Sequence, residues 1–78
     1  MNSLVVDDKQ LAVNAVVRIV ITLDPEGTCE GVRTADAALE YVRTHAVDVA
    51  FLDVEMPQMT GLELAKRIKD VRPNVNII

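Results

Sequence analysis

The chain has 78 residues, half of them hydrophobic, and only Tyr41 and Phe51 are aromatic, which indicates one small domain with an aliphatic core. The net charge of -4 argues against direct nucleic-acid binding, which needs a basic surface. The sequence shows no signal-peptide pattern and no apolar run near the roughly 20 residues of a membrane span. The single cysteine, Cys29, cannot form an internal disulfide, so we expect a reduced, cytoplasmic setting.

The first apolar segment, Leu4–Val6, predicts a short strand that runs directly into Asp7 and Asp8. Residues 10–23 then follow a helical pattern. Most of the other positions in this segment are also apolar, so we expect the helix to be buried on most sides. The face expected to point inward consists of Ala12, Val16, Ile19, Val20 and Leu23.

A turn at Asp24–Gly27 precedes a second strand at Thr28–Val32, which is less apolar and is therefore expected near a sheet edge. Thr34 is placed to cap a helix over residues 35–45. We expect His45 to be a solvated residue at the end of that helix and not a metal ligand, because no second histidine exists. The inward stripe of the helix consists of Ala35, Ala38, Leu39 and Val42.

The apolar run Val49–Leu52 predicts a strand covered on both faces, and Asp53 comes where that run stops. Ligands of open α/β sheets bind at the carboxyl ends of strands. Met56 and Pro57 then turn the chain out of the sheet, because proline restricts the residue before it. Asp53 is therefore either a carboxylate that takes part in binding or chemistry, or a strand-end aspartate that is simply exposed to water.

Thr60 and Glu63 form a T-x-x-E capping box, which predicts a helix start. This helix is expected to run to about residue 71, with Leu64, Ala65, Ile68 and Val71 facing inward. Val75–Ile78 begins a further strand. Because strands and helices alternate, the sequence predicts an α/β fold with a parallel sheet and helices on both faces.

Asp7, Asp8 and Asp53 meet at one edge of the sheet if the first and third strands are neighbours. Three carboxylates that lie close together repel one another, so either one of them takes up a proton or a cation neutralises the cluster. Mg²⁺ suits such oxygen ligands, because it keeps several waters and favours one or two carboxylates together with a phosphate. An ionised aspartate beside Mg²⁺ can attack a phosphoryl group and form an acyl phosphate.

Three segments together resemble the receiver domain of two-component response regulators: residues 6–8 (Val-Asp-Asp), residues 51–57 (Phe-Leu-Asp-Val-Glu-Met-Pro) and residues 60–64 (Thr-Gly-Leu-Glu-Leu). The resemblance implies a flavodoxin-like doubly wound parallel sheet with strand order 2-1-3-4-5. Residues 1–78 are expected to be the N-terminal portion of such a domain, truncated within the fourth strand. The residues around Asp53 also resemble, more weakly, receivers that precede a LytTR-type DNA-binding domain.

The resemblance implies that Asp53 is the phosphoacceptor in a phosphorelay, and that the chain is a signalling module and not an enzyme. It also implies that Asp8, Asp53 and the backbone carbonyl of Glu55 hold Mg²⁺ directly, while Asp7 acts through a metal-bound water. Met56–Pro57 and Gly61 are expected to shape the adjoining loop. The implied phosphodonor is a sensor histidine kinase or a small acyl phosphate. Nucleic acid is expected to be bound only through an output domain that this chain lacks.

The chain departs from the receiver pattern in its extent and at Lys9, where many receivers carry another acid. Receivers have five strands and five helices. The Thr or Ser that ends the fourth strand, the Lys that ends the fifth strand and the last two helices all lie beyond Ile78. One alternative is therefore a phosphorylation-incompetent receiver fragment that acts through protein–protein association. Such a fragment is expected to self-associate, and the contact is expected to form through the Gln10–Leu23 helix and the Val75–Ile78 edge.

A second alternative is a metal-dependent phosphatase that turns over an aspartyl phosphate. Enzymes of that class typically place a second aspartate two residues after the nucleophile, where it acts as an acid and base. This chain has Glu55 at that position, followed by Met-Pro. The phosphatase is therefore the less favoured interpretation.

Overall fold

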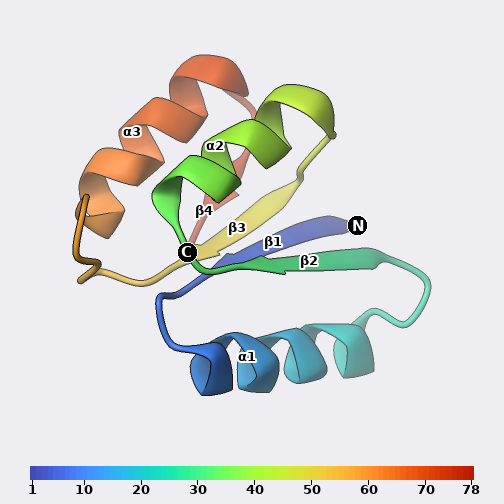
Figure 1. Cartoon of the computed structure of the whole chain (residues 1–78). Coiled ribbons are helices and arrows are strands. Elements are labelled where there is room, and N and C mark those ends of the chain that lie inside the picture. Colours follow the sequence, from blue (N-terminus) through green and yellow to red (C-terminus); the bar gives the residue numbers. More distant parts are fainter.

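Four parallel strands form one sheet in the order β2-β1-β3-β4 (Figure 1). The computed structural model describes all residues from Met1 to Ile78. The order confirms the predicted flavodoxin-like arrangement, the neighbouring first and third strands, and the edge position of the second strand. The first strand begins two residues earlier than predicted. The strands are β1 (Asn2–Val6), β2 (Thr28–Val32), β3 (Val49–Leu52) and the short β4 (Asn76–Ile77).

The three helices cover the two faces of the sheet unequally. α1 (Gln10–Leu23) lies alone on one face, while α2 (Ala35–Thr44) and α3 (Gly61–Val71) lie side by side on the other (Figure 1). Both predicted caps are present: Thr34 Oγ1 accepts from the Ala37 amide at 3.0 Å, and Thr60 Oγ1 accepts from the Glu63 amide at 3.2 Å. These caps fix where α2 and α3 begin, and thus where the preceding loops must turn.

The main core lies between the sheet and the α2–α3 layer. All four residues predicted on the inward stripe of α2 are buried, and so are Leu64 and Ile68 of α3. The prediction for Val71 is wrong, since its side chain is 38% exposed. α3 ends at Val71, and the next residue, Arg72, is the one that turns toward α2, where its Nε donates to the Val42 carbonyl at 2.8 Å. The core residues are Leu4, Val6, Ala35, Ala38, Leu39, Val42, Val47, Ala50, Leu64, Ile68 and Val75.

α1 is buried on one side only, so within residues 1–78 it lacks the cover beyond the sheet that its apolar pattern predicts. Val13 is its one fully buried residue, and two residues predicted to face inward, Ile19 and Leu23, are 58% and 80% exposed. The helix packs on β1 and β2 with a face centred on Val13 and Val17, which lie over Gly31 of β2. Apolar residues surround almost the whole helix, so periodicity alone does not select this face. The opposite side of α1 therefore presents apolar side chains to solvent.

His45 ends α2 and is exposed, as predicted, and its ring stacks on Tyr41 with the centroids 4.1 Å apart. Cys29 is partly buried on β2. None of the three helices combines the length and the apolar content that a membrane span requires.

Candidate functional site

Three carboxylates meet at the carboxyl end of the two central strands. Val6 pairs with Leu52 at the end of the β1–β3 ladder, and the Asp53 amide donates to the Val6 carbonyl at 2.9 Å. One carboxylate oxygen from each of Asp7, Asp8 and Asp53 lies within 4.8 Å of the others. We call these three residues the acid triad. Parallel neighbours end at the same sheet edge, so the predicted convergence of the three acids is confirmed.

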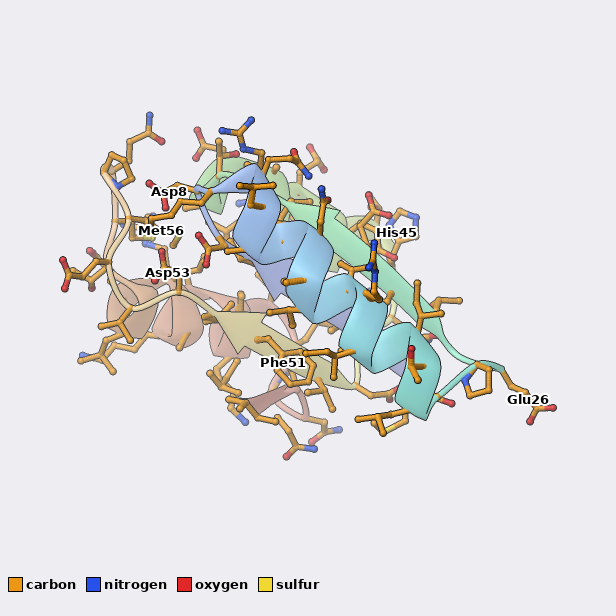
Figure 2. All side chains as sticks on the ribbon, turned by 90° about the horizontal axis from the view of Figure 1, so that it is seen from below. Asp8, Glu26, His45, Phe51, Asp53 and Met56 are labelled. Atoms are coloured by element: carbon orange, nitrogen blue, oxygen red, sulfur yellow. The ribbon has the colours of Figure 1, made fainter.

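Figure 2 shows how this end of the sheet is arranged. Asp8, Asp53 and Met56 lie together there, while Phe51 lies within β3, away from that end and beside α1. His45 and Glu26 lie well away from the triad (Figure 2), so the single histidine does not join the site.

Local hydrogen bonds position two of the acids and leave one oxygen without a partner. Asp7 Oδ1 accepts from the Lys9 amide at 3.0 Å, which turns the chain from β1 into α1. Asp53 Oδ1 accepts a long hydrogen bond, 3.4 Å, from the Glu55 amide. Asp53 Oδ2 is buried and accepts no hydrogen bond. A buried acceptor without a partner costs about 1–3 kcal/mol, so this oxygen is prepared to receive a cation or a new bond.

Lys9 contributes a cation that the sequence interpretation did not assign to the site. Its Nζ lies 3.2 Å from Asp8 Oδ1 and 3.9 Å from both Asp7 Oδ1 and Asp53 Oδ2. The hydrogen bond from the Lys9 ammonium holds the pKa of Asp8 below its usual value and raises the pKa of Lys9 in return. The sequence signal for this contact was a lysine directly after an acid pair. The direction in which the lysine side chain points, however, depends on the turn into α1.

A second residue that sequence reasoning missed is Arg33, which follows β2. Its Nε and Nη2 donate to the Asp8 main-chain carbonyl at 3.2 and 3.0 Å, and so fix the loop that carries Asp8. Beside this contact lies a pocket of about 380 Å³, which Asp8 alone of the triad lines. The pocket is lined by Asp8, Arg33, Thr34, Ala35, Met56, Pro57, Gln58 and Met59.

Gly61 brings the start of α3 against the loop that carries Asp53. The Gly61 amide donates to the Val54 carbonyl at 2.9 Å. A Cβ at this position would overlap the Asp53 carbonyl oxygen and would lie 3.0 Å from the Asp53 carbonyl carbon. Glycine therefore permits an approach of main chain to main chain that holds Asp53 at the strand end.

The donor chemistry of the acid triad fits a hard divalent cation. All three ligand groups are carboxylates, and Asp53 Oδ2 accepts no hydrogen bond. Of the residues predicted to bind metal, the structure brings Asp7, Asp8 and Asp53 together. The Glu55 amide points at Asp53, and the role of the Glu55 carbonyl stays a prediction.

A profile of the response regulator receiver domain matches residues 3–78. The chain belongs to this family. Over 81 aligned residues it is 40% identical to "Stress response regulator protein 1" of Debaryomyces hansenii, and the alignment covers 99% of this chain and 33% of that protein. This receiver thus spans a third of the length of that relative.

Solved structures agree with the family. The crystal structure of histidine kinase ThkA in complex with response regulator TrrA matches with a TM-score of 0.83 and 25% identity, covering 97% of this receiver and 64% of the matched chain. The MaeR response regulator bound to beryllium trifluoride matches with a TM-score of 0.88. That match covers 100% of this receiver and 64% of the MaeR chain, and its identity of 15% bears on the fold alone.

Family membership indicates what kind of site the acid triad is. Receiver domains are typically non-enzymatic signalling modules, and this triad is typical of their Mg²⁺ site. The finer resemblance to receivers with a LytTR output domain stays a prediction.

Proposed function

We propose that this receiver accepts a phosphoryl group on Asp53 in a two-component phosphorelay. The observation that carries the proposal is Asp53 Oδ2, a buried carboxylate oxygen without a hydrogen-bond partner where three carboxylates meet. Asp53 also lies at the carboxyl end of a central parallel strand, which is where ligands of such sheets bind. The neighbouring pocket is open space next to Asp8, on one side of the triad.

The residues that would hold Mg²⁺ are Asp8 and Asp53 directly, together with the Glu55 main-chain carbonyl, while Asp7 would act through a bound water. This assignment is supported by the carboxylate oxygens that lie within 4.8 Å of one another. Mg²⁺, when bound, supplies positive charge that offsets the repulsion between the triad and an anionic phosphoryl group. The chain itself contributes the fixed positions of the carboxylates, because β1 and β3 hold their ends in register.

The proposed transfer is a nucleophilic substitution at phosphorus. A carboxylate oxygen of Asp53 forms the new bond to phosphorus, and the bond from phosphorus to the donor breaks. Acetate leaves when the donor is acetyl phosphate, and an imidazole nitrogen leaves when the donor is a phosphohistidine. The product is a mixed anhydride on Asp53. A carboxylate nucleophile carries no proton to remove, so the transfer needs no general base.

We propose a sensor histidine kinase as the partner that supplies the phosphoryl group. Support comes from the related regulator TrrA, which was crystallised with the histidine kinase ThkA. We further propose that residues 1–78 form the N-terminal portion of a receiver domain, because the chain spans 64% of the matched TrrA and MaeR chains.

The test is the intact mass of the protein after incubation with Mg²⁺ and acetyl phosphate. The parent chain is expected to gain one phosphoryl group, and Asp53→Asn is expected to gain none. Asp70→Asn is the matched control, because it removes an exposed carboxylate on α3 and should be modified like the parent. Absence of an adduct on the parent, in a sample that circular dichroism shows to be folded, would refute the proposal. An adduct on Asp53→Asn would show that the phosphoryl group is elsewhere.

The alternative function is association of two copies without phosphorylation, and the exposed face of α1 favours it. Leu11, Ile19 and Leu23 are 84%, 58% and 80% exposed on that helix. Ile78 at the β4 edge is 70% exposed, whereas Val75 is buried and does not contribute a side chain to such a contact. Apolar surface of this kind is typical of association sites.

Light scattering coupled to size-exclusion chromatography tests the association. The parent chain is expected to show a mass that rises with concentration, and Ile19→Lys is expected to suppress that rise. Leu62→Lys is the control, because Leu62 is 69% exposed on α3, on the opposite face of the sheet. A parent chain that stays monomeric at every concentration rules out the alternative.

A further inference from the structure

The Lys9 ammonium is placed where the three acids of the triad meet. It lies within 4 Å of one carboxylate oxygen from each of them, and the shortest distance, 3.2 Å, is a hydrogen bond to Asp8. Arg33, the other cation near the site, points both of its bonded nitrogens at the Asp8 main-chain carbonyl and not at a carboxylate. Lys9 is therefore the cation that offsets part of the side-chain charge of the triad.

We propose that Lys9 is a built-in counter-ion of the acid triad, which a divalent cation must displace in order to bind. This inference rests on the proposed function, because it concerns the same Mg²⁺ site. It assigns Lys9 the role of setting how tightly the receiver holds the metal.

Competition follows from the shared oxygens. Mg²⁺ needs its ligand oxygens at about 2.0–2.1 Å, so the carboxylates must converge on it more closely than they converge on the ammonium. The oxygens that Lys9 contacts belong to Asp8 and Asp53, which would hold the metal directly, and to Asp7, which would act through a water. A second positive charge left at 3–4 Å from these oxygens would repel the metal. The ammonium and Mg²⁺ therefore exclude one another.

Displacement of Lys9 is easy in this structure. Its side chain is 70% exposed, and its one hydrogen bond to the site is the bond to Asp8. The residue lies just before α1, outside the helix, so the side chain can swing into solvent without disturbing helical packing. The Lys9 amide, which donates to Asp7, can stay in place while the ammonium leaves.

The proposal has two consequences of opposite sign. Without metal, Lys9 relieves repulsion among the three carboxylates, so its removal should lower the thermal stability of the metal-free protein. With metal, Lys9 is a competitor, so its removal should tighten Mg²⁺ binding. Removal of a residue that only supported the fold would lower stability both without and with metal. Removal of a residue that helped to bind the metal would weaken Mg²⁺ affinity.

The experiment compares four proteins at low ionic strength, where exposed charges are least screened. The set is the parent chain, Lys9→Gln, Lys9→Arg and the control Lys66→Gln, which makes the same change of net charge on the exposed surface of α3. Mg²⁺ affinity is measured by isothermal titration calorimetry, and melting in EDTA by circular dichroism. Lys9→Gln is expected to bind Mg²⁺ about tenfold more tightly than the parent. Lys9→Arg and Lys66→Gln are expected to stay within about twofold of it.

The two measurements separate failure of this inference from failure of the proposed function. Mg²⁺ affinity in Lys9→Gln that equals or falls below the parent affinity overturns the competition. Absence of Mg²⁺ binding in all four proteins overturns the proposed metal site and the competition with it. The EDTA melts then still decide the counter-ion role: a melting temperature of Lys9→Gln below that of Lys66→Gln upholds it, and equal temperatures refute it.

Discussion

Gly61→Ala tests whether the contact between α3 and the Asp53 loop controls both stability and the site. In an unstrained helix this substitution would stabilise the protein by about 0.4–1 kcal/mol, because alanine reduces the freedom of the unfolded chain. No glycine of this chain has a positive φ, so backbone conformation does not oppose the change. Contact with neighbouring atoms therefore decides the sign of the effect.

The three atoms nearest to the added methyl group all belong to the main chain of Asp53 and Val54. It would overlap the Asp53 carbonyl oxygen and lie 3.0 Å from the Asp53 carbonyl carbon and 3.1 Å from the Val54 Cα, whereas ordinary contacts begin at 3.4 Å. Main-chain atoms cannot rotate away as a side chain can, so the start of α3 and the loop must separate. Overpacking of this kind costs about 1–3 kcal/mol, which exceeds the gain from the unfolded state.

We expect Gly61→Ala to lower the free energy of unfolding by about 1–2 kcal/mol, measured by urea denaturation followed by circular dichroism. Because Asp53 moves with the loop, the yield of the acetyl phosphate adduct should fall as well. Ala65→Gly is the control: it costs about 1 kcal/mol through helix propensity in the middle of α3 but leaves the adduct yield unchanged. A Gly61→Ala protein as stable as the parent, or more stable, would refute the reasoning.

Three further predictions concern a cap, a charge and a thiol. Thr34→Ala removes the acceptor for the Ala37 amide and should lower the free energy of unfolding by about 1 kcal/mol, and an unchanged urea midpoint would contradict this. Asp53→Asn removes one of the three like charges that meet in the acid triad and should raise the free energy of unfolding in EDTA by about 1 kcal/mol, whereas a decrease would show that Lys9 compensates the charge. Burial, with a smaller contribution from Glu30, raises the pKa of the Cys29 thiol. Iodoacetamide should therefore alkylate folded protein more slowly than urea-unfolded protein at mildly alkaline pH, and the two rates should converge as pH rises, whereas equal rates throughout would contradict the shift.

The sequence alone determined the elements of the fold and the chemistry at their ends. Alternating apolar runs and helical patterns placed the strands and helices within about two residues. Capping residues such as Thr34 and Thr60 located helix starts, because a cap acts within one turn of its own helix. Asp7 and Asp53 were recognised because a parallel strand that ends in an acid brings that acid to the ligand-binding edge. Each of these signals is local in the chain.

Only the tertiary structure decided which side of α1 meets the sheet and which cation meets the acids. α1 is apolar almost all round, so its inward face depends on contact with Gly31, a residue of another element, and Ile19 and Leu23 were assigned wrongly. The placement of Lys9 against three carboxylates depends on the direction of the chain between β1 and α1. A residue pattern records periodicity along one element, whereas both of these outcomes depend on distances between elements. Those distances are fixed only when the sheet and the helices pack together.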